Sequence, residues 1–258
     1  MNIRSALCLC GILAGVCSCS SLSPSGAPPL RVGFTPNYPP ICTETFDGPA
    51  GLEFDFARAL AQAMHRPLEL MEMPWEKQIP ALLAGKTDLI MSGMTVTPAR
   101  AARVTFCEPY MSNPLVAMGR ADESNVPTSP EEGLSTTANI GVLGHTSAES
   151  YVRKQYPQAR IVALSGRTDA PMLLKSRRID YYIDDLAAIA DLVARDEAQL
   201  SVLPFPLKEQ KLAWAVRPEE TALQAEANRV LAQWKQSGEL DTMINRWMPY
   251  RRLLSTGP

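Results

Sequence analysis

The chain has no excess of charge of either sign and very little histidine. Its 258 residues include 25 Lys and Arg against 27 Asp and Glu, which gives a net charge of −2. No basic block is present, which argues against nucleic acid as a partner. The two histidines, His65 and His145, lack ligand spacing to a cysteine, so neither a metal site nor a cofactor is expected. With 46% hydrophobic residues, the chain can bury one large core or two modest ones.

The apolar run at the N-terminus, residues 6–16, is too short to span a bilayer but suits the core of a signal peptide. The stretch Val16-Cys17-Ser18-Cys19 that follows resembles a bacterial lipobox. We expect lipidation of Cys19; lipidation of Cys17 and an ordinary cleaved signal peptide are the alternatives. Residues 20–29 are rich in Ser, Pro and Gly and are expected to form a tether. The sequence therefore predicts a lipoprotein signal over residues 1–19 and a membrane-anchored protein in the periplasm or at the cell surface.

The rest of the chain is organised around residues 75–110. Residues 76–84 have apolar side chains at helical spacing, and residues 88–91 form a short strand candidate. This strand opens into a turn of small and hydroxyl residues, 92–98, and Arg100 follows in the expected first turn of the next helix. A guanidinium can hold both oxygens of a carboxylate, and a loop of this kind adds neutral donors. The pattern therefore predicts a carboxylate receptor at Arg100.

These residues also resemble a known family. The runs IPALLAGKTDLIMSGMTVTPAR and VTFCEPY look like the signature of bacterial extracellular solute-binding proteins of the polar-amino-acid type, the two-lobed receptors of amino-acid ABC importers. The resemblance extends from Leu30 to about Trp247, with several motifs in the expected order. It implies an α/β, two-lobed periplasmic-binding-protein fold (type II) with the ligand in the interlobe cleft. It also implies an amino-acid ligand and an ABC transporter permease as partner, and we expect a monomer.

The alternation of strand and helix patterns itself predicts α/β lobes, each with a mostly parallel sheet flanked by helices. We expect the chain to cross into the second lobe near Met118 and to return near Trp214. Lobe one would then comprise residues 30–117 and 212–258, and lobe two residues 118–211. Two connecting segments of this kind form a hinge beside a cleft.

Two cysteines remain after the signal and lipidation region, Cys42 and Cys107. An even number in an oxidising compartment permits a disulfide. Both lie in the predicted first lobe, on segments that the family places near each other. The alternative is two separate buried thiols.

The resemblance also implies how a zwitterionic ligand would be held, since each of its charges needs a partner when buried. Arg100, Thr95 and the amides near Gly93 would bind the carboxylate from lobe one, and the amides of Thr146 and Ser147 from lobe two. Asp185 would bind the ammonium, and Tyr38 and Trp75 would enclose the side chain. Asp184, which precedes Asp185 on the same strand, is expected to point elsewhere, to the rim or to solvent.

The chain departs from the family pattern at a few of these positions. Thr35 stands where many members have an acidic residue, which weakens the case for lysine or arginine as ligand. His145 stands where glycine is common, and its ring could lie at the pocket rim or face solvent. Glu53 replaces the usual aspartate. Thr146 and Glu149 are spaced as a capping box at a helix start.

Two other functions fit parts of the pattern. Taken singly, Arg100 could be a surface ion-pair partner and Asp185 a helix cap, but the ordered set favours a binding site. Dehydratases resembling cyclohexadienyl dehydratase share these motifs and add a pocket acid, for which Asp184 and Glu149 are candidates. A lipoprotein that senses the ligand without serving an importer is the other alternative. Nothing else in the chain supports catalysis, and we expect a non-enzymatic receptor.

Overall fold

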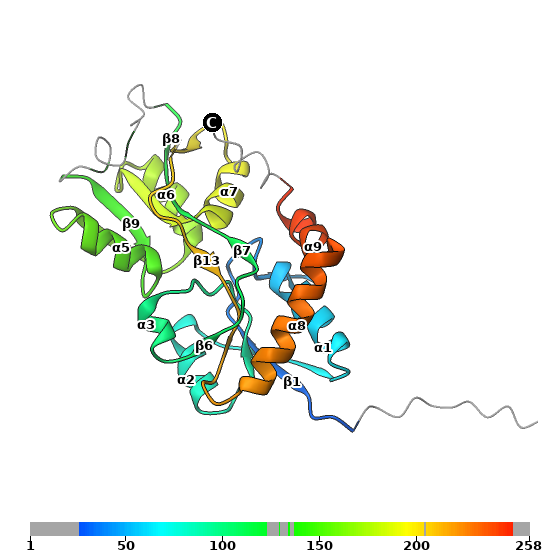
Figure 1. Cartoon of the computed structure of the whole chain (residues 1–258). Helices are drawn as coiled ribbons and strands as arrows, with labels where there is room; N and C mark the ends of the chain where they lie inside the picture. The colour runs from blue at the N-terminus through cyan, green and yellow to red at the C-terminus, as the bar shows by residue number, and fades with distance from the viewer. Residues whose placement is uncertain (1–25, 123–128, 130–133, 135–136, 204, 250–258) are drawn as a thin grey trace, which may run out of the picture.

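The computed structural model describes residues 26–122, 129, 134, 137–203 and 205–249 (Figure 1). The first sheet forms around β1 (Leu30–Phe34), the first strand of the described chain. Leu30, Val32 and Phe34 of that strand are buried, and parallel neighbours lie on both of its sides. The strands lie in the order β4 (Leu68–Glu72), β1 (Leu30–Phe34), β5 (Leu89–Ile90), β14 (Ala215–Val216) and β6 (Thr105–Phe106). β14 runs antiparallel to β5 and β6, so the sheet is mixed at the edge where the chain returns.

Helices from both ends of the chain cover this first sheet. They are α1 (Leu52–Ala63), α2 (Gln78–Leu83), α3 (Pro98–Ala101), α8 (Thr221–Ser237) and α9 (Glu239–Trp247), with the 3-10 turn η1 (Trp75–Lys77) before α2. α8 and α9 pack beside α1, as Figure 1 shows. The rings of Phe56, Trp214 and Trp234 meet there at centroid distances of 5.7 to 6.0 Å. The core of lobe one therefore joins segments far apart in the sequence.

The second sheet has the same mixed character. Its strands lie in the order β10 (Arg160–Leu164), β9 (Asn139–Leu143), β11 (Tyr181–Asp185), β8 (Leu115–Arg120) and β12 (Leu200–Val202). β9, β10 and β11 are parallel, whereas β8 is antiparallel to β11 and to β12. The flanking helices are α5 (Ser147–Gln155), α6 (Ala170–Lys175) and α7 (Leu186–Ala194), with the 3-10 turn η2 (Arg167–Asp169) before α6.

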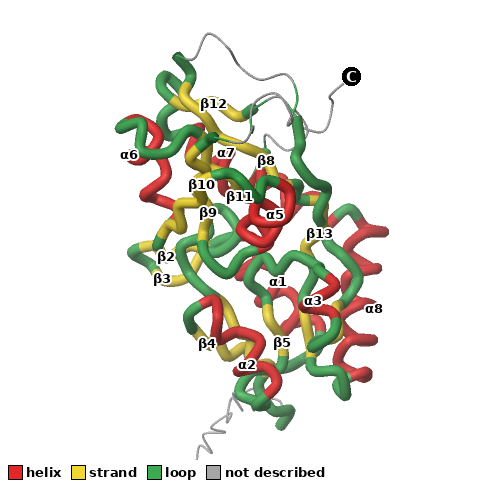
Figure 2. Tube along the Cα trace, turned by 90° about the vertical axis from the view of Figure 1, so that its left-hand side faces the viewer, coloured by secondary structure: helices red, strands yellow, loops and turns green. Residues whose placement is uncertain are grey.

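The lobes are joined by the antiparallel strands β7 (Met111–Ser112) and β13 (Lys211–Leu212), which lie between them in Figure 1. Figure 2 shows β13 between the lobes from the side. β8 pairs with β11 and β12 of the second sheet, so the expected crossing between residues 117 and 118 is wrong. The chain enters lobe two at residues 113–114 instead, because every residue of β8 pairs with β11 or with β12. The expected return at residue 212 lies within β13.

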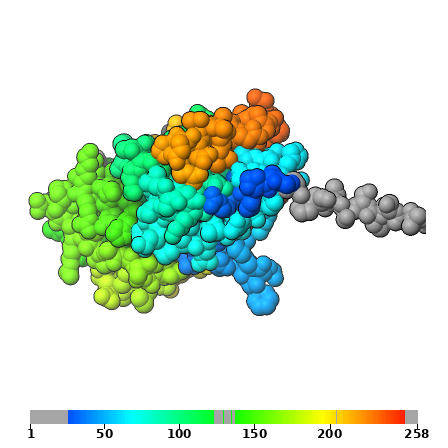
Figure 3. Space-filling view, turned by 90° about the horizontal axis from the view of Figure 1, so that it is seen from below, coloured from blue at the N-terminus to red at the C-terminus, as the bar shows by residue number. Residues whose placement is uncertain are grey.

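A β-hairpin made of β2 (Thr43–Thr45) and β3 (Gly48–Ala50) projects from lobe one (Figure 3). The side chain of Phe46 in its turn is exposed. Cys42, just before β2, and Cys107 are both buried free thiols. The structure therefore contradicts a disulfide between them and agrees with the alternative of two separate buried thiols.

Most of the expected elements are present with shifted ends. The helix expected over residues 76–84 begins as the turn η1 and continues as α2, and Gly85 after it has a left-handed φ of 68°. Of the described residues, no helix is long and apolar enough to cross a membrane, and no cluster of His, Cys, Asp and Glu could hold a metal ion. The predicted signal peptide and Cys19 lie outside the described residues.

Candidate ligand-binding site

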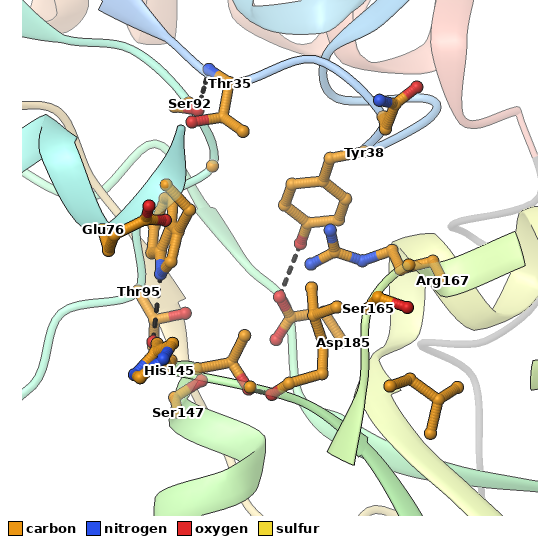
Figure 4. Close-up of a pocket in the computed structure, with 18 of the residues that line it drawn as sticks. Thr35, Tyr38, Glu76, Ser92, Thr95, His145, Ser147, Ser165, Arg167 and Asp185 are labelled. Atoms are coloured by element: carbon orange, nitrogen blue, oxygen red, sulfur yellow. Dashed lines mark hydrogen bonds between the residues drawn. The ribbon is translucent and has the colours of Figure 1, made fainter. Parts of the chain in front are cut away.

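A cavity of about 750 Å³ lies between the lobes. All eight residues that the sequence predicted for the ligand line it: Tyr38, Trp75, Gly93, Thr95 and Arg100 from lobe one, and Thr146, Ser147 and Asp185 from lobe two. Figure 4 shows the labelled members of this set around one space, with further residues that the sequence reasoning missed. These include Glu76, Ser92, Ser165 and Arg167.

Arg100 is held at the cavity wall by the start of α3. The Thr97 side chain caps this short helix by accepting a hydrogen bond from the Arg100 amide, and Pro98 occupies its first position. The guanidinium Nη1 donates to the Thr95 carbonyl at 2.8 Å, and its carbon lies 5.0 Å from the centroid of the Trp75 ring. Burial lowers the pKa of Arg100, and the negative charge of Asp185 opposes that shift. An anionic ligand would compensate the charge that burial leaves poorly solvated.

Gly93 forms the floor of the cavity beneath Tyr38. Its φ is 65°, and a Cβ there would lie 2.5 Å from Cε1 of Tyr38, so a larger residue would strain the backbone and displace the ring. Its amide donates to Oε1 of Glu53 at 2.8 Å. The Gly93 amide itself is therefore engaged by the protein and is not the free carboxylate donor that we expected.

Glu53 ties this floor to the core of lobe one. It is buried and accepts hydrogen bonds from Gly93, from the Tyr110 hydroxyl at 2.7 Å and from Nε1 of Trp214 at 3.0 Å. Burial raises the pKa of Glu53 to about 7, although these donors act in the opposite direction. A carboxylate this deep is tolerated because three donors converge on it.

Asp185 reaches the cavity from the end of β11. Its Oδ2 accepts a hydrogen bond from the Tyr38 hydroxyl at 2.6 Å, across the cleft. Its Oδ1 is buried and has no partner among the described residues. Burial and the neighbouring charge of Asp184 raise the pKa of Asp185 to about 7, against the Tyr38 hydrogen bond and the charges of Arg167 and Arg100. A cationic group placed at Oδ1 would satisfy this orphaned acceptor.

Tyr38 is fixed in place by more than Asp185. The amide Nδ2 of Asn113, in the crossing segment, donates to its hydroxyl at 3.0 Å. The Asn113 Oδ1 accepts from the amide of Ala187 at 3.0 Å, so one side chain connects the crossing segment to lobe two and to Tyr38. Burial and the charge of Asp185 raise the pKa of Tyr38, which keeps its hydroxyl a donor at neutral pH.

Asp184 does not face the rim or solvent, as the sequence reasoning expected. It is buried on the other side of β11, where it accepts from Nε of Arg167 at 2.8 Å and from the Tyr182 hydroxyl at 2.6 Å. The two neighbouring carboxylates were correctly expected to point different ways, but Asp184 is paired with Arg167, an arginine that also lines the cavity. That partner was invisible in the local sequence.

Arg167 is the main residue that the sequence reasoning missed. It lies in η2, just after the carboxyl end of β10, and its guanidinium carbon is 4.0 Å from the centroid of the Tyr38 ring. Figure 4 shows it against that ring and close to Asp185. The one signal that could have found it is its place after a parallel strand, where such sheets present side chains to a cleft.

The loop before α5 supplies the wall opposite Trp75. His145 has a left-handed φ of 61°, which explains why glycine suits this position. Its side chain is exposed at the rim, and its carbonyl accepts a hydrogen bond from Nε1 of Trp75 at 3.0 Å. Thr146 caps α5 by accepting from the Glu149 amide, while Glu149 accepts from the amide of His145. The predicted capping box therefore forms one residue wider, and Thr146 and Ser147, at the start of α5, both line the cavity.

Thr35 is a neutral part of the wall. Its hydroxyl donates to the Met73 carbonyl at 2.9 Å and accepts from Nε2 of Gln78 at 3.0 Å. Its amide donates to the Ser92 hydroxyl at 2.9 Å. The position that many members fill with an acid thus carries no charge here and is already engaged in hydrogen bonds.

Comparison with known proteins places this geometry in a family. The model of the bacterial extracellular solute-binding proteins, family 3, matches residues 30–250. The chain belongs to that family. It is 27% identical over 244 residues to the ABC transporter arginine-binding protein 1 of Escherichia coli (strain K12), covering 92% of this chain and 98% of that protein. It is 30% identical over 174 residues to the L-arginine-binding protein of Pseudomonas aeruginosa, covering 66% of each.

Solved structures of the family have the same fold. A variant of ArgBP from T. maritima superposes with a TM-score of 0.78 at 31% identity, over 85% of this chain and 95% of that one. The ancestral amino acid-binding protein AncCDT-1, a precursor of cyclohexadienyl dehydratase, gives 0.77 at 30% identity, over 84% and 94%. These matches confirm the predicted family and the two-lobed type II fold.

Proposed function

We propose that this solute-binding protein captures an amino acid, or a related small zwitterion, outside the cytoplasm and delivers it to an ABC importer. The observation that carries the proposal is a pair of opposite charges on opposite walls of one cavity. Arg100 would bind the ligand carboxylate from lobe one, and Oδ1 of Asp185 would bind its ammonium from lobe two. Each ligand charge then gains a partner in place of the water it loses.

The remaining cavity residues complete the proposed site. Thr95 and the amides of Thr146 and Ser147 would add donors to the carboxylate, and the rings of Tyr38 and Trp75 would enclose the rest of the ligand. Gly93 contributes the space for Tyr38 rather than a donor. Mixed polar and aromatic walls of this kind orient a small polar ligand.

Delivery would depend on hinge closure. Both lobes supply ligand contacts, so the closed form gains contacts that the open form lacks, and ligand shifts the equilibrium toward closure. The bonds from Tyr38 to Asp185 and from Trp75 to the His145 carbonyl would form in that closed state. β7 and β13 are two residues long each and pair where the chain crosses between the lobes, which supports a hinge there.

A thermal-shift screen of the purified mature domain against the amino acids tests the proposal. A ligand at a hundredfold its dissociation constant adds about 2.7 kcal/mol of stability, which is a clear rise in Tm. Calorimetry then gives the affinity, and small-angle scattering should show a smaller radius of gyration with ligand. If no amino acid or related zwitterion stabilises the domain, the proposed function is wrong.

We infer that the protein is a receptor and not an enzyme, although the similarity to AncCDT-1 makes a dehydratase the alternative to test. Neither acid that the sequence suggested as proton donor, Asp184 or Glu149, lines the cavity in the described structure. Asp185 does line it, and its raised pKa would favour acid chemistry. Turnover of a prephenate-like acid by the purified protein would contradict the inference.

We also propose that the mature protein is a monomer tethered to the membrane by lipid on Cys19. The short apolar run, the lipobox-like spacing and the Ser-Pro-Gly stretch that follows support the tether. Mass spectrometry of the membrane fraction should find a lipidated N-terminal Cys19, and light scattering of the soluble domain should give one chain per particle. A mature N-terminus downstream of Cys19 would contradict the lipid anchor. A mature N-terminus at Cys17 would mean that Cys17, and not Cys19, carries the lipid.

A further inference from the structure

We propose that Arg167 reads the side chain of the ligand, so that this pocket selects an amino acid whose side chain ends in an oxygen acceptor, a carboxylate or an amide. Amino acids with cationic side chains would be disfavoured. The inference rests on the proposed function and adds the class of ligand to it.

Arg167 is placed as a binding group and is held there firmly. Its side chain is 14% exposed and lines the cavity. Nε donates to Oδ2 of Asp184 at 2.8 Å, and the guanidinium plane is supported by the Tyr38 ring at 4.0 Å. Among the described residues, Nη1 and Nη2 have no acceptor, although an arginine carries several N–H donors on these atoms. The buried side chain thus presents unused donors at a fixed position in the cavity.

The charges around the cavity leave Arg167 as the group that meets the ligand side chain. The carboxylate and ammonium of the ligand would occupy Arg100 and Asp185. Asp184 is already satisfied by Arg167, by the Tyr182 hydroxyl and by the Asp185 amide, so it is not an open site for a second cation. Glu76, the other carboxylate in the lining, is exposed at the edge and strongly solvated.

Hydrogen-bond chemistry then decides between ligand classes. An oxygen acceptor placed at Nη1 or Nη2 gains a charge-assisted hydrogen bond from a donor that is already ordered. A second guanidinium or ammonium in the same space meets a like charge and no open acceptor, because the Thr35 position is neutral and already engaged. We therefore expect this chain to differ in ligand from the relatives that are named for arginine.

The test begins with the wild-type domain and needs no variant. Calorimetry should be run with glutamate, glutamine, norvaline, arginine and lysine. Glutamate or glutamine should bind at least about tenfold more tightly than norvaline, the worth of one hydrogen bond to a charged group, and more tightly than arginine and lysine. A preference for glutamate over glutamine would identify a carboxylate, and the reverse an amide. Tighter binding of arginine or lysine would overturn the inference and leave the proposed function standing.

A matched variant then assigns the preference to Arg167. Arg167→Met with Asp184→Asn removes both members of the buried pair, so no unpaired charge is left behind. This double variant should lose the advantage of glutamate or glutamine over norvaline, so the ratio of the two affinities should fall by at least about tenfold. Arg195→Met, which removes an exposed partner of Asp191 on α7, is the control and should bind as wild type does.

The failure modes are distinguishable. Equal weakening of norvaline and glutamine in a folded double variant would make Arg167 a brace for Tyr38 and would overturn the inference. If that variant does not fold, Arg167→Lys keeps the charge beside Asp184 but loses the guanidinium fork, and it should weaken glutamate or glutamine by at least about tenfold relative to norvaline. An unchanged ratio would overturn the inference. Absence of binding by every amino acid to the wild type would remove both the inference and the proposed function.

Discussion

The hydroxyl of Tyr38 donates to Oδ2 of Asp185 at 2.6 Å, joining residues that lie 147 positions apart on opposite lobes. The same carboxylate keeps Oδ1 buried and without a partner in the described structure. One oxygen of Asp185 is therefore used to close the cleft, and the other is open to a ligand. This division of one carboxylate underlies the first three predictions.

Tyr38→Phe should weaken amino-acid binding and move its pH dependence. The phenol hydrogen bond lowers the pKa of Asp185, so its loss raises that pKa further and leaves less carboxylate at neutral pH. Affinity at pH 7 should fall about tenfold, with much of the loss recovered at pH 9. Calorimetry at the two pH values measures this. A loss that is equal at both would mean that Tyr38 acts only through packing.

Asp185→Asn should separate zwitterions from simple acids. The variant keeps the shape and removes the charge, so amino-acid binding should weaken by about 2–4 kcal/mol, in the range of a truncated buried charge pair. Binding of a des-amino analogue, which has no ammonium, should be nearly unchanged. Calorimetry with both ligand types is the measurement. Equal loss of both would make Asp185 a structural residue only.

In the wild type, amino-acid affinity should fall as the pH drops below about 7. The ammonium binds the ionised form of Asp185, and burial raises the pKa of that group to about 7. Protonation at lower pH therefore competes with the ligand, and affinity should decline by up to about tenfold per pH unit toward pH 5. The Asp185→Asn variant should show a flat profile. A wild-type profile that is flat from pH 5 to 8 would contradict the ammonium assignment.

Arg100→Ala should abolish binding while the domain stays folded. Loss of one partner of a buried charge pair costs about 3–5 kcal/mol, or more than a hundredfold in affinity. Arg100→Lys should also bind weakly, because one ammonium cannot reproduce the two-pronged contact of a guanidinium. Circular dichroism establishes the fold and calorimetry the affinity. Near-normal affinity in the folded Ala variant would remove Arg100 from the site.

Glu53→Gln should change how the stability of the domain depends on pH. Burial raises the pKa of Glu53 from 4.5 to about 7, so between these values the folded protein binds more protons than the unfolded chain. The contribution of Glu53 to the free energy of unfolding is therefore fully present below pH 4.5 and is lost as the pH rises through 7. The loss is on the order of 3 kcal/mol.

Denaturant unfolding of wild type and variant across pH 4.5 to 8 measures this difference. The stability of the wild type relative to Glu53→Gln should decrease with rising pH, because the amide does not titrate. Other groups, Asp185 included, are common to both proteins and cancel in the comparison. A difference that stays constant or grows with pH would show that Glu53 is ionised throughout and is held by its three donors.

The sequence by itself determined the family, the α/β class and the positions of the eight residues expected at the ligand. It could do so because each of these depends on local order: a strand, then a turn of small residues, then an arginine at a helix start. Arg100 lies in α3, which Thr97 caps, and this is where the local pattern places it. The alternation that separates Asp184 from Asp185 is equally local.

Only the tertiary structure decided what these groups contact. Arg167 comes from another strand end and turns Asp184 from an expected surface residue into half of a buried pair. Glu53 engages the Gly93 amide from 40 positions away, so a donor expected for the ligand is used by the core. The even number of cysteines permitted a disulfide, but Cys42 and Cys107 are free thiols. β8 belongs wholly to the sheet of the second lobe. Hydrogen bonds and ion pairs of this kind depend on distances between segments remote in sequence, and local patterns do not contain those distances.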